Sequence, residues 1–377
     1  MKKLINTLYF TLLALGCFAQ SPSLTSVLQR AKKENKLIFI DCYFTGCIPC
    51  AQMDENVFPN ELVKAEMDKN FLMLKVDIFK DKLGDTLKVQ HILNGFPTFL
   101  VLNSDGKLIS SSSGYKDPGN LLALFTDARQ KAAQHELLSG FSAQYDEKKY
   151  PSFYVEFCKT RKGITPGILA AYSDTLKNFK AENALLPYLV SRSADEKAIE
   201  TIFSDYNGFL SLYGADVLQP VIDYGLNQRL AKAMKTNLND AVFEDFLTDH
   251  KKYFTEKTWK ICLQTLGNKY FLGMKKDTVG FLKFSIKNPV LYQFHFSALY
   301  STLEAKKGFS PEITRLFCKW ADAIVTEDSG LEFMKTAAAV NKKAQDEAGY
   351  SRFIKMAASY ASKYKMKTGP INESGSK

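Results

Sequence analysis

The sequence predicts an α/β domain followed by an all-α domain. Up to about residue 135, short runs rich in β-branched and aromatic residues alternate with helical stretches. From residue 136 onward helical periodicity replaces these runs, and glycines and prolines interrupt it at short intervals. A chain of 377 residues is long for one compact unit, so we expect two domains, at 20–135 and 136–364.

The elements of the first domain are predicted in order from hydrophobic periodicity. Strands are expected at 37–40 and 71–77, and a hairpin surrounds the Asn-Ser-Asp-Gly turn of residues 103–106. The hairpin strands are predicted at 98–102 and 107–112, and helices at 24–36, 62–71, 83–93 and 121–133.

The second domain contains many short predicted helices. One is expected at 142–161, and two separate helices are expected at 215–226 and 228–236. Such a series suggests an array of helical pairs, although no fixed repeat period is found. The polar tail, residues 365–377, is expected to be disordered.

A C-x-x-C pair, Cys47 and Cys50, follows the first predicted strand. Pro49 suits the first turn of a helix, which places Cys47 at or just before a helix N-terminus. Unpaired N–H groups and the positive end of the helix dipole stabilise a thiolate there. The pKa of such a thiol falls from about 8.5 to roughly 3.5–7.5, and Cys50 lies one turn along, within disulfide reach. The spacing therefore predicts a redox site.

Zinc sites use the same spacing, so the alternative has to be weighed. A closed zinc site needs two further ligands, usually a second C-x-x-C or a histidine pair. This chain has neither, because its other cysteines are isolated and its four histidines are widely spread. We expect no metal and no cofactor.

Two further features accompany the pair: Asp41, inside the first apolar strand, and the Gly-Phe-Pro-Thr stretch of residues 95–98. Together these residues resemble the thioredoxin superfamily, over roughly residues 24–134. The resemblance implies the thioredoxin-like fold, a central mixed sheet flanked by helices. It also implies that Asp41 assists proton transfer to Cys50, and that Phe96 and a cis Pro97 present backbone to a substrate peptide.

The motif departs from thioredoxin itself at two positions. Gly46 stands where thioredoxin has a tryptophan, and Ile48 stands where it has a glycine. The missing tryptophan removes a flat aromatic surface for contact with partners. The details are more similar to exported thioredoxin-like proteins of Bacteroidetes-type bacteria.

The N-terminus predicts export. Two lysines precede an apolar stretch, and small residues precede Gln20, so residues 1–19 are expected to be a signal peptide cleaved after Ala19. Residues 14–17 partly match a lipoprotein signal, which makes a lipid anchor through Cys17 the alternative. We expect a periplasmic protein, where disulfides persist, served by a membrane thiol-electron donor or acceptor.

Charge is uneven along the chain. Residues 20–135 hold 14 Lys/Arg and 13 Asp/Glu, which leaves most of the net charge of +10 on the helical part. We interpret the excess as solvated lysine faces of helices rather than a surface for polyanions, and nucleic acid is not an expected partner. The cysteines Cys42, Cys158, Cys262 and Cys318 are expected to be buried, although a disulfide between two of the last three is an open alternative.

These observations predict an exported thiol–disulfide oxidoreductase that exchanges disulfides with protein substrates. Cys47 would form the mixed disulfide, Cys50 would resolve it and Asp41 would accept the proton. The alternative is a non-catalytic binding module in which the α/β fold scaffolds the larger helical domain.

Overall fold

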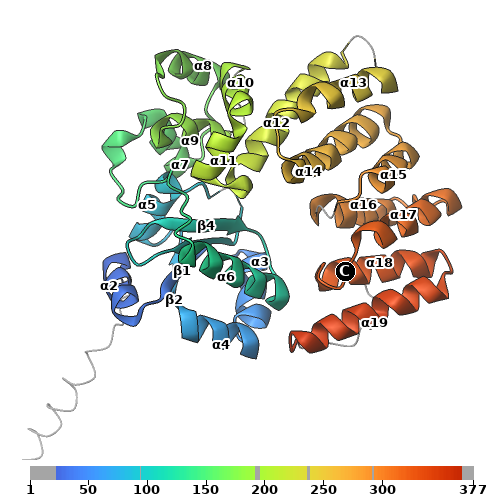
Figure 1. Ribbon diagram of the computed structural model, residues 1–377, viewed down its shortest axis with the longest axis horizontal. Coiled ribbons are helices and arrows are strands. Elements are labelled where there is room, and N and C mark those ends of the chain that lie inside the picture. Colours follow the sequence, from blue (N-terminus) through green and yellow to red (C-terminus); the bar gives the residue numbers. More distant parts are fainter. Residues whose placement is uncertain (1–22, 94, 192–195, 236–237, 291–292, 367–377) are drawn as a thin grey trace, which may run out of the picture.

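The structure is a computed structural model that describes residues 23–93, 95–191, 196–235, 238–290 and 293–366. Figure 1 shows an α/β domain on one side and a series of helices that curves around to meet it again. The predicted fold class is confirmed: a mixed sheet flanked by helices is followed by a predominantly helical region.

The sheet has four strands in the order β2-β1-β3-β4. β1 (Leu37–Tyr43) pairs parallel with β2 (Phe71–Asp77) and antiparallel with β3 (Thr98–Leu102), and β3 pairs antiparallel with β4 (Leu108–Ser113). The register places Asp41 opposite Lys75 on one side and opposite Phe99 on the other. All four predicted strands are present, and β1 extends three residues beyond its predicted end.

Helices cover both faces of the sheet. On one face lie α3 (Ile48–Gln52), the π-helical turn η1 (Met53–Val57), α4 (Glu61–Asn70) and α6 (Pro118–Ala133). Their core is aromatic, because Phe39 stacks on Phe99 and meets Phe125 edge to face. The other face carries α2 (Leu24–Glu34) and α5 (Lys82–Gln90), packed over the aliphatic side chains of β1.

The helical region begins with the short helix η2 (Glu147–Lys149). Its helices then follow in chain order: α7 Ser152–Thr160, α8 Pro166–Thr175, α9 Glu182–Ser191, α10 Glu196–Ser204, α11 Tyr206–Tyr213, α12 Ala215–Ala233, α13 Asp240–Lys251, α14 Glu256–Gly267, η3 Asn268–Lys275, α15 Thr278–Lys287, α16 Gln293–Ala305, α17 Pro311–Ile324, α18 Leu331–Lys343 and α19 Glu347–Lys363.

Two of the predictions for this region are wrong. The helix expected at 142–161 is a loop and η2 followed by α7, because Tyr150, which precedes Pro151, is extended and Pro151 itself caps the start of α7. The helices expected at 215–226 and 228–236 form the single helix α12, which contains Pro220 near its start. Buried packing along α12 keeps the helix continuous where the sequence pattern suggested a break.

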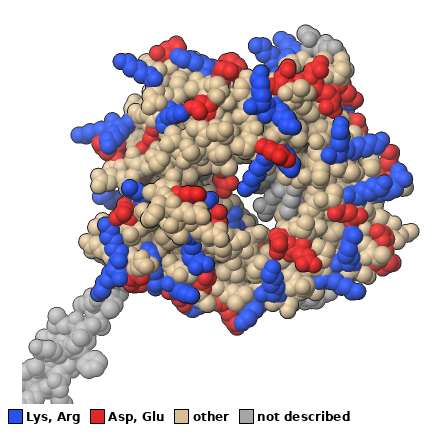
Figure 2. Space-filling view, viewed as in Figure 1, with Lys and Arg blue, Asp and Glu red and all other residues tan. Residues whose placement is uncertain are grey.

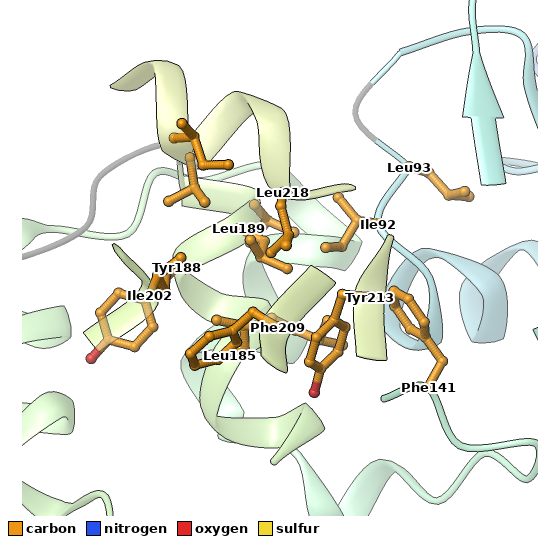
Figure 3. Close-up of a cluster of buried hydrophobic side chains, with 14 of the residues drawn as sticks. Ile92, Leu93, Phe141, Leu185, Tyr188, Leu189, Ile202, Phe209, Tyr213 and Leu218 are labelled. Carbon is orange, nitrogen blue, oxygen red and sulfur yellow. The ribbon is translucent and has the colours of Figure 1, made fainter. Parts of the chain in front are cut away.

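One hydrophobic core joins the two regions. Figure 3 shows Ile92 and Leu93, which follow α5, in the same cluster as Phe141 and the α11 residues Phe209 and Tyr213. The Tyr213 ring lies 5.2 Å from that of Phe141 in an edge contact. The segment that leads to Pro97 is therefore held by the helical region as well as by the sheet.

The helical region contacts the α/β domain again at its far end. Asp117, the N-cap of α6, accepts hydrogen bonds from the Tyr360 hydroxyl of α19 (2.8 Å) and from the Leu331 N–H of α18 (3.2 Å). The Asn60 side chain donates to the carbonyls of Tyr364 and Lys365. The last helices of the chain therefore contact the α/β domain directly. Figure 2 shows a hollow in the surface near the centre, between the α/β domain and these helices.

Lysine and arginine side chains alternate with aspartate and glutamate over the face drawn in Figure 2. No described helix is both long and apolar enough to cross a membrane. The expected signal peptide, the alternative anchor at Cys17 and the tail beyond residue 366 lie outside the described residues.

Candidate functional site: a disulfide at a helix N-terminus

The loop after β1 delivers Cys47 to the start of a helix. Gly46 has φ +94°, a left-handed conformation that favours glycine, and it turns the chain from the strand into α3. The Cys47 N–H donates to the Phe44 carbonyl at 3.1 Å, which closes this turn. Cys47 is the N-cap of α3, and Pro49 lies in the first turn, as the sequence predicted.

Cys47 and Cys50 are joined by a disulfide with an S–S distance of 2.00 Å, and both residues are buried. The Cys50 N–H donates to the Cys47 sulfur at 3.3 Å. Helical backbone continues from Ile48 through Val57, so the unpaired N–H groups at its start lie at the Cys47 end. Such N–H groups can stabilise a negative charge that develops beside them.

Asp41 lies beneath this helix. Side chains alternate along β1, so Asp41 shares a face with Phe39, which packs against Met53 and Val57 of η1. The carboxyl is only 2% exposed, and its Oδ1 atom has no hydrogen-bond partner among the described residues.

Burial raises the pKa of Asp41 from 3.8 to about 6. Lys75, whose Nζ lies 3.7 Å from the Asp41 carboxylate, opposes this rise, and the negative charge of Asp54 adds to it. Lys75 also pairs with Asp54, so one lysine on β2 is shared by a buried and a half-exposed carboxylate. A carboxyl with a pKa near 6 can hold or release a proton close to neutral pH.

The resemblance also implied a cis peptide bond, and Phe96–Pro97 is cis. The sheet register places Thr98 opposite Cys42, so Pro97 lies beside the end of β1 that carries the loop to Cys47. None of the other described residues forms a hydrogen bond with the backbone N–H or C=O of Phe96. The Pro97 carbonyl, by contrast, accepts the Gly114 N–H at 2.8 Å.

Asp77 is a site residue that the sequence analysis missed. It ends β2, and its Oδ2 accepts from the N–H (3.1 Å) and hydroxyl (2.7 Å) of Thr45, just before Gly46. Burial tends to raise the pKa of Asp77, but the bonds from Thr45 and Phe79 outweigh it and hold this pKa below its usual range. Asp77 therefore anchors the loop in front of Cys47. Only the pairing of β1 with β2 reveals this role, since the two residues are 32 positions apart.

The other cysteines are free and buried in apolar surroundings: Cys42, Cys158, Cys262 and Cys318. Burial raises the pKa of all four thiols, to about 11 for Cys158 and Cys318. The predicted core role is confirmed, and the open alternative of a disulfide among the last three is wrong. His91 is buried beside Phe141, and burial lowers its pKa to about 4, so it is neutral at pH 7.

Comparison with known protein families assigns the first region. Residues 24–129 match the family model for a thioredoxin-like domain. The α/β domain is therefore a thioredoxin-like domain, of the superfamily that the sequence motifs indicated. No curated protein matches the chain. A redox or disulfide function is supported at the level of this superfamily.

Proposed function

We propose that this protein is an exported thiol–disulfide oxidoreductase that exchanges disulfides with protein substrates. The observation that carries the proposal is the buried Cys47–Cys50 disulfide at a helix N-terminus, with Asp41 buried on the sheet face beneath that helix. The family match to residues 24–129 supports the same class of activity.

Reduction of a client disulfide would take two exchanges. The Cys47 thiolate attacks one client sulfur, the client S–S bond breaks, and the departing client thiolate takes up a proton. The Cys50 thiol then loses its proton to Asp41 and attacks the Cys47 sulfur, which releases the second client thiolate, and this thiolate takes up the proton from Asp41. Two electrons and two protons reach the client, and the protein is left as the Cys47–Cys50 disulfide.

The client chain would bind across the cis peptide. The free N–H and C=O of Phe96 fit pairing with an extended peptide, as in the addition of a strand to a sheet edge. Pro97 is buried, so it would act by fixing the direction of the Phe96 backbone.

The proposal includes a location and a redox partner. A signal peptide at residues 1–19, or a lipid anchor through Cys17, would place the protein in the periplasm. A membrane thiol-electron donor or acceptor would then reset the Cys47–Cys50 pair after each cycle. The direction of net electron flow follows from the potential of the pair.

The first test is a redox titration of the signal-free protein in thiol/disulfide buffers, read by mass after alkylation. A reversible two-electron transition is expected: near −270 mV for a reductant, or about −120 to −180 mV for an oxidant or isomerase. The variant Cys50→Ala should trap mixed disulfides with client proteins, whereas Cys47→Ala should trap none. Absence of any reversible transition would contradict the proposal and leave a helical binding module on a thioredoxin-like scaffold.

A further inference from the structure

A cavity of about 390 Å³ lies where the helical region meets the thioredoxin-like domain. One wall is formed by the end of β4, the loop that follows it and α6. The other wall is formed by α18 and the loop before it. Sites for small molecules commonly have volumes of about 300–1,000 Å³ and lie between structural units. The space is therefore large enough for a compact organic ligand that would touch both regions.

Contacts between the two walls fix the shape of this cavity. The Lys116 N–H donates to the Met53 sulfur of η1 at 3.5 Å, and the next residue, Asp117, accepts from α18 and α19. Gly330, just before α18, has φ +94°, and a Cβ there would lie 2.9 Å from the amide nitrogen of Asn120. The two walls therefore meet at one edge of the cavity as closely as a glycine allows.

Four polar side chains of the lining form no hydrogen bond or ion pair with another described residue: Ser112, Tyr115, Lys116 and Asn120. Each of them can donate a hydrogen bond, and the lysine adds a positive charge. Burial and the charges of Asp117 and Glu332 raise the pKa of Tyr115, so its hydroxyl keeps its proton at neutral pH and can donate. Unused donors gathered around one space favour a ligand that accepts hydrogen bonds.

Lys116 is the charged member of this set. It is half-buried, and burial lowers the pKa of its ammonium group, although the charges of Asp216 and Asp117 oppose this effect. An anion bound beside Lys116 would stabilise the charged form. One unpaired lysine matches one negative charge, which favours a carboxylate over a phosphate dianion.

The acidic residues of the lining already have lysine partners. Asp127 pairs with Lys131 at 2.7 Å, and Asp328 pairs with Lys363 at 3.3 Å. Their charges are thus partly neutralised, whereas no described carboxylate forms an ion pair with Lys116. The cavity therefore offers a cation to a ligand more readily than an anion.

We propose that this cavity binds a small organic acid, whose carboxylate is held by Lys116 and whose apolar body packs on Phe333. Phe333 lies on α18 and is buried, so its ring supplies an apolar surface from the helical region. Ala123 and Leu124 of α6 add apolar lining from the other wall. The site is separate from the disulfide, and binding there does not depend on the proposed oxidoreductase activity.

Isothermal titration calorimetry of the purified protein tests the site, with phenylbutyrate and its neutral amide as probes. The two molecules are nearly identical in shape and differ in charge. We expect phenylbutyrate to bind at least about tenfold more tightly than the amide, because it alone can accept a hydrogen bond between charged groups from Lys116. Lys116→Met should weaken the binding of phenylbutyrate at least about tenfold and change that of the amide by less than about twofold.

Lys335→Met is the matched control, because Lys335 is also on α18 but pairs with Glu332 at 3.2 Å and does not line the cavity. It removes the same charge and should change the affinity for phenylbutyrate by less than about twofold. Ala123→Trp, at an exposed position of α6, places a large side chain in the cavity and should abolish the binding of both probes.

Three results would overturn the inference: no binding of phenylbutyrate to wild type, equal affinities for the carboxylate and the amide, or unchanged binding in Lys116→Met or Ala123→Trp. An equal loss in Lys335→Met and Lys116→Met would also overturn it, because the effect would then come from net charge. Disulfide exchange is measured separately, so each of these results leaves the proposed function standing.

Discussion

Cys47 of the thioredoxin-like domain and Cys158 of the helical region are both buried, yet their surroundings have opposite effects. Cys47 caps a helix, and its sulfur accepts the Cys50 N–H, so a negative charge on the sulfur is stabilised. Cys158 lies inside α7, in the apolar core beside Tyr154, where burial raises its pKa to about 11. At Cys158 the effect of burial on the pKa exceeds the opposing effects of the Tyr154 hydroxyl and of the Arg161 and Lys88 charges.

The helical region differs from the thioredoxin-like domain in chemistry but supports its geometry. The Tyr154 hydroxyl donates to the Val89 carbonyl at 2.6 Å, and Arg161 donates to the Leu93 carbonyl at 3.1 Å. Both acceptors belong to the segment that leads to the cis Phe96–Pro97 bond. At the other end, α18 and α19 bind Asp117 at the start of α6. The helical region therefore contacts the thioredoxin-like domain at two separate places, once before β3 and once at the start of α6.

We expect the largest effect on the rate of disulfide reduction when one cysteine in each region is replaced by serine. Cys47→Ser removes the proposed nucleophile, so the rate of disulfide reduction should fall by more than about a thousandfold. Cys158→Ser should leave that rate within about twofold, since its thiol takes no part in the chemistry. Reduction of glutathione disulfide by each variant measures both rates, and a large loss in Cys158→Ser would refute the contrast.

The buried carboxyl provides the next test. The pKa of Asp41 rises from 3.8 to about 6 on folding, so the folded state binds a proton more tightly than the unfolded state. The free energy of unfolding should therefore fall by about 3 kcal/mol as pH rises from about 4 to 7. Asp41→Asn cannot ionise at this position, so it should not lose this stability as the pH rises and should be more stable than wild type at pH 8. Its disulfide exchange should be slower than that of wild type.

Urea unfolding at pH 4 and pH 8 measures this difference. Asp68→Asn is the control, because the Asp68 side chain is exposed and pairs with the exposed Lys64, so the change should alter stability by less than about 1 kcal/mol. Equal pH dependence of wild type and Asp41→Asn would show that Asp41 is not the group responsible.

The contact that closes the fold is tested at Asp117. Asp117→Ala removes an N-cap and leaves the Tyr360 hydroxyl and the Leu331 N–H without their acceptor, at a cost of about 2–4 kcal/mol in stability. Asp277→Ala is the matched control, since Asp277 caps α15 through the Gly280 N–H alone and should cost about 1 kcal/mol. If Asp117→Ala and Asp277→Ala lose the same stability in thermal or urea unfolding, the contact of Asp117 with α18 and α19 adds no stability.

The smallest effect is expected at Asp54. Its negative charge raises the pKa of Asp41, and it shares Lys75 with that carboxylate. Asp54→Asn should therefore lower the pKa of Asp41 and move the midpoint of the pH–rate profile to lower pH. Glu55→Gln, the neighbouring exposed carboxylate, is the control and should leave the midpoint in place. A shift in the opposite direction would contradict the shared-lysine arrangement.

The strands and the redox pair could be predicted because their signals are local. Hydrophobic runs mark strands, and the Pro49 of the C-x-x-C pair marks a helix start, so Cys47 was placed correctly at an N-cap. The helix expected at 142–161 is wrong because the chain is extended at Tyr150 and Pro151, although apolar periodicity continues across them. The break expected in α12 was wrong because burial along the helix kept it continuous.

The sequence by itself determined the order of elements in the first region, the C-x-x-C pair at a helix start and the place of Asp41 in an apolar strand, since each depends on residues close together in the chain. Tertiary structure alone decided the spacing and charge of the site. Lys75 and Asp77 reach Asp41 and Thr45 only through the pairing of β2 with β1, and Phe79, two residues after the end of β2, reaches Phe44 for the same reason. Asp117 meets Tyr360 across 243 positions because the helices curve back onto the domain. Contacts between distant segments depend on packing, and no local pattern encodes them.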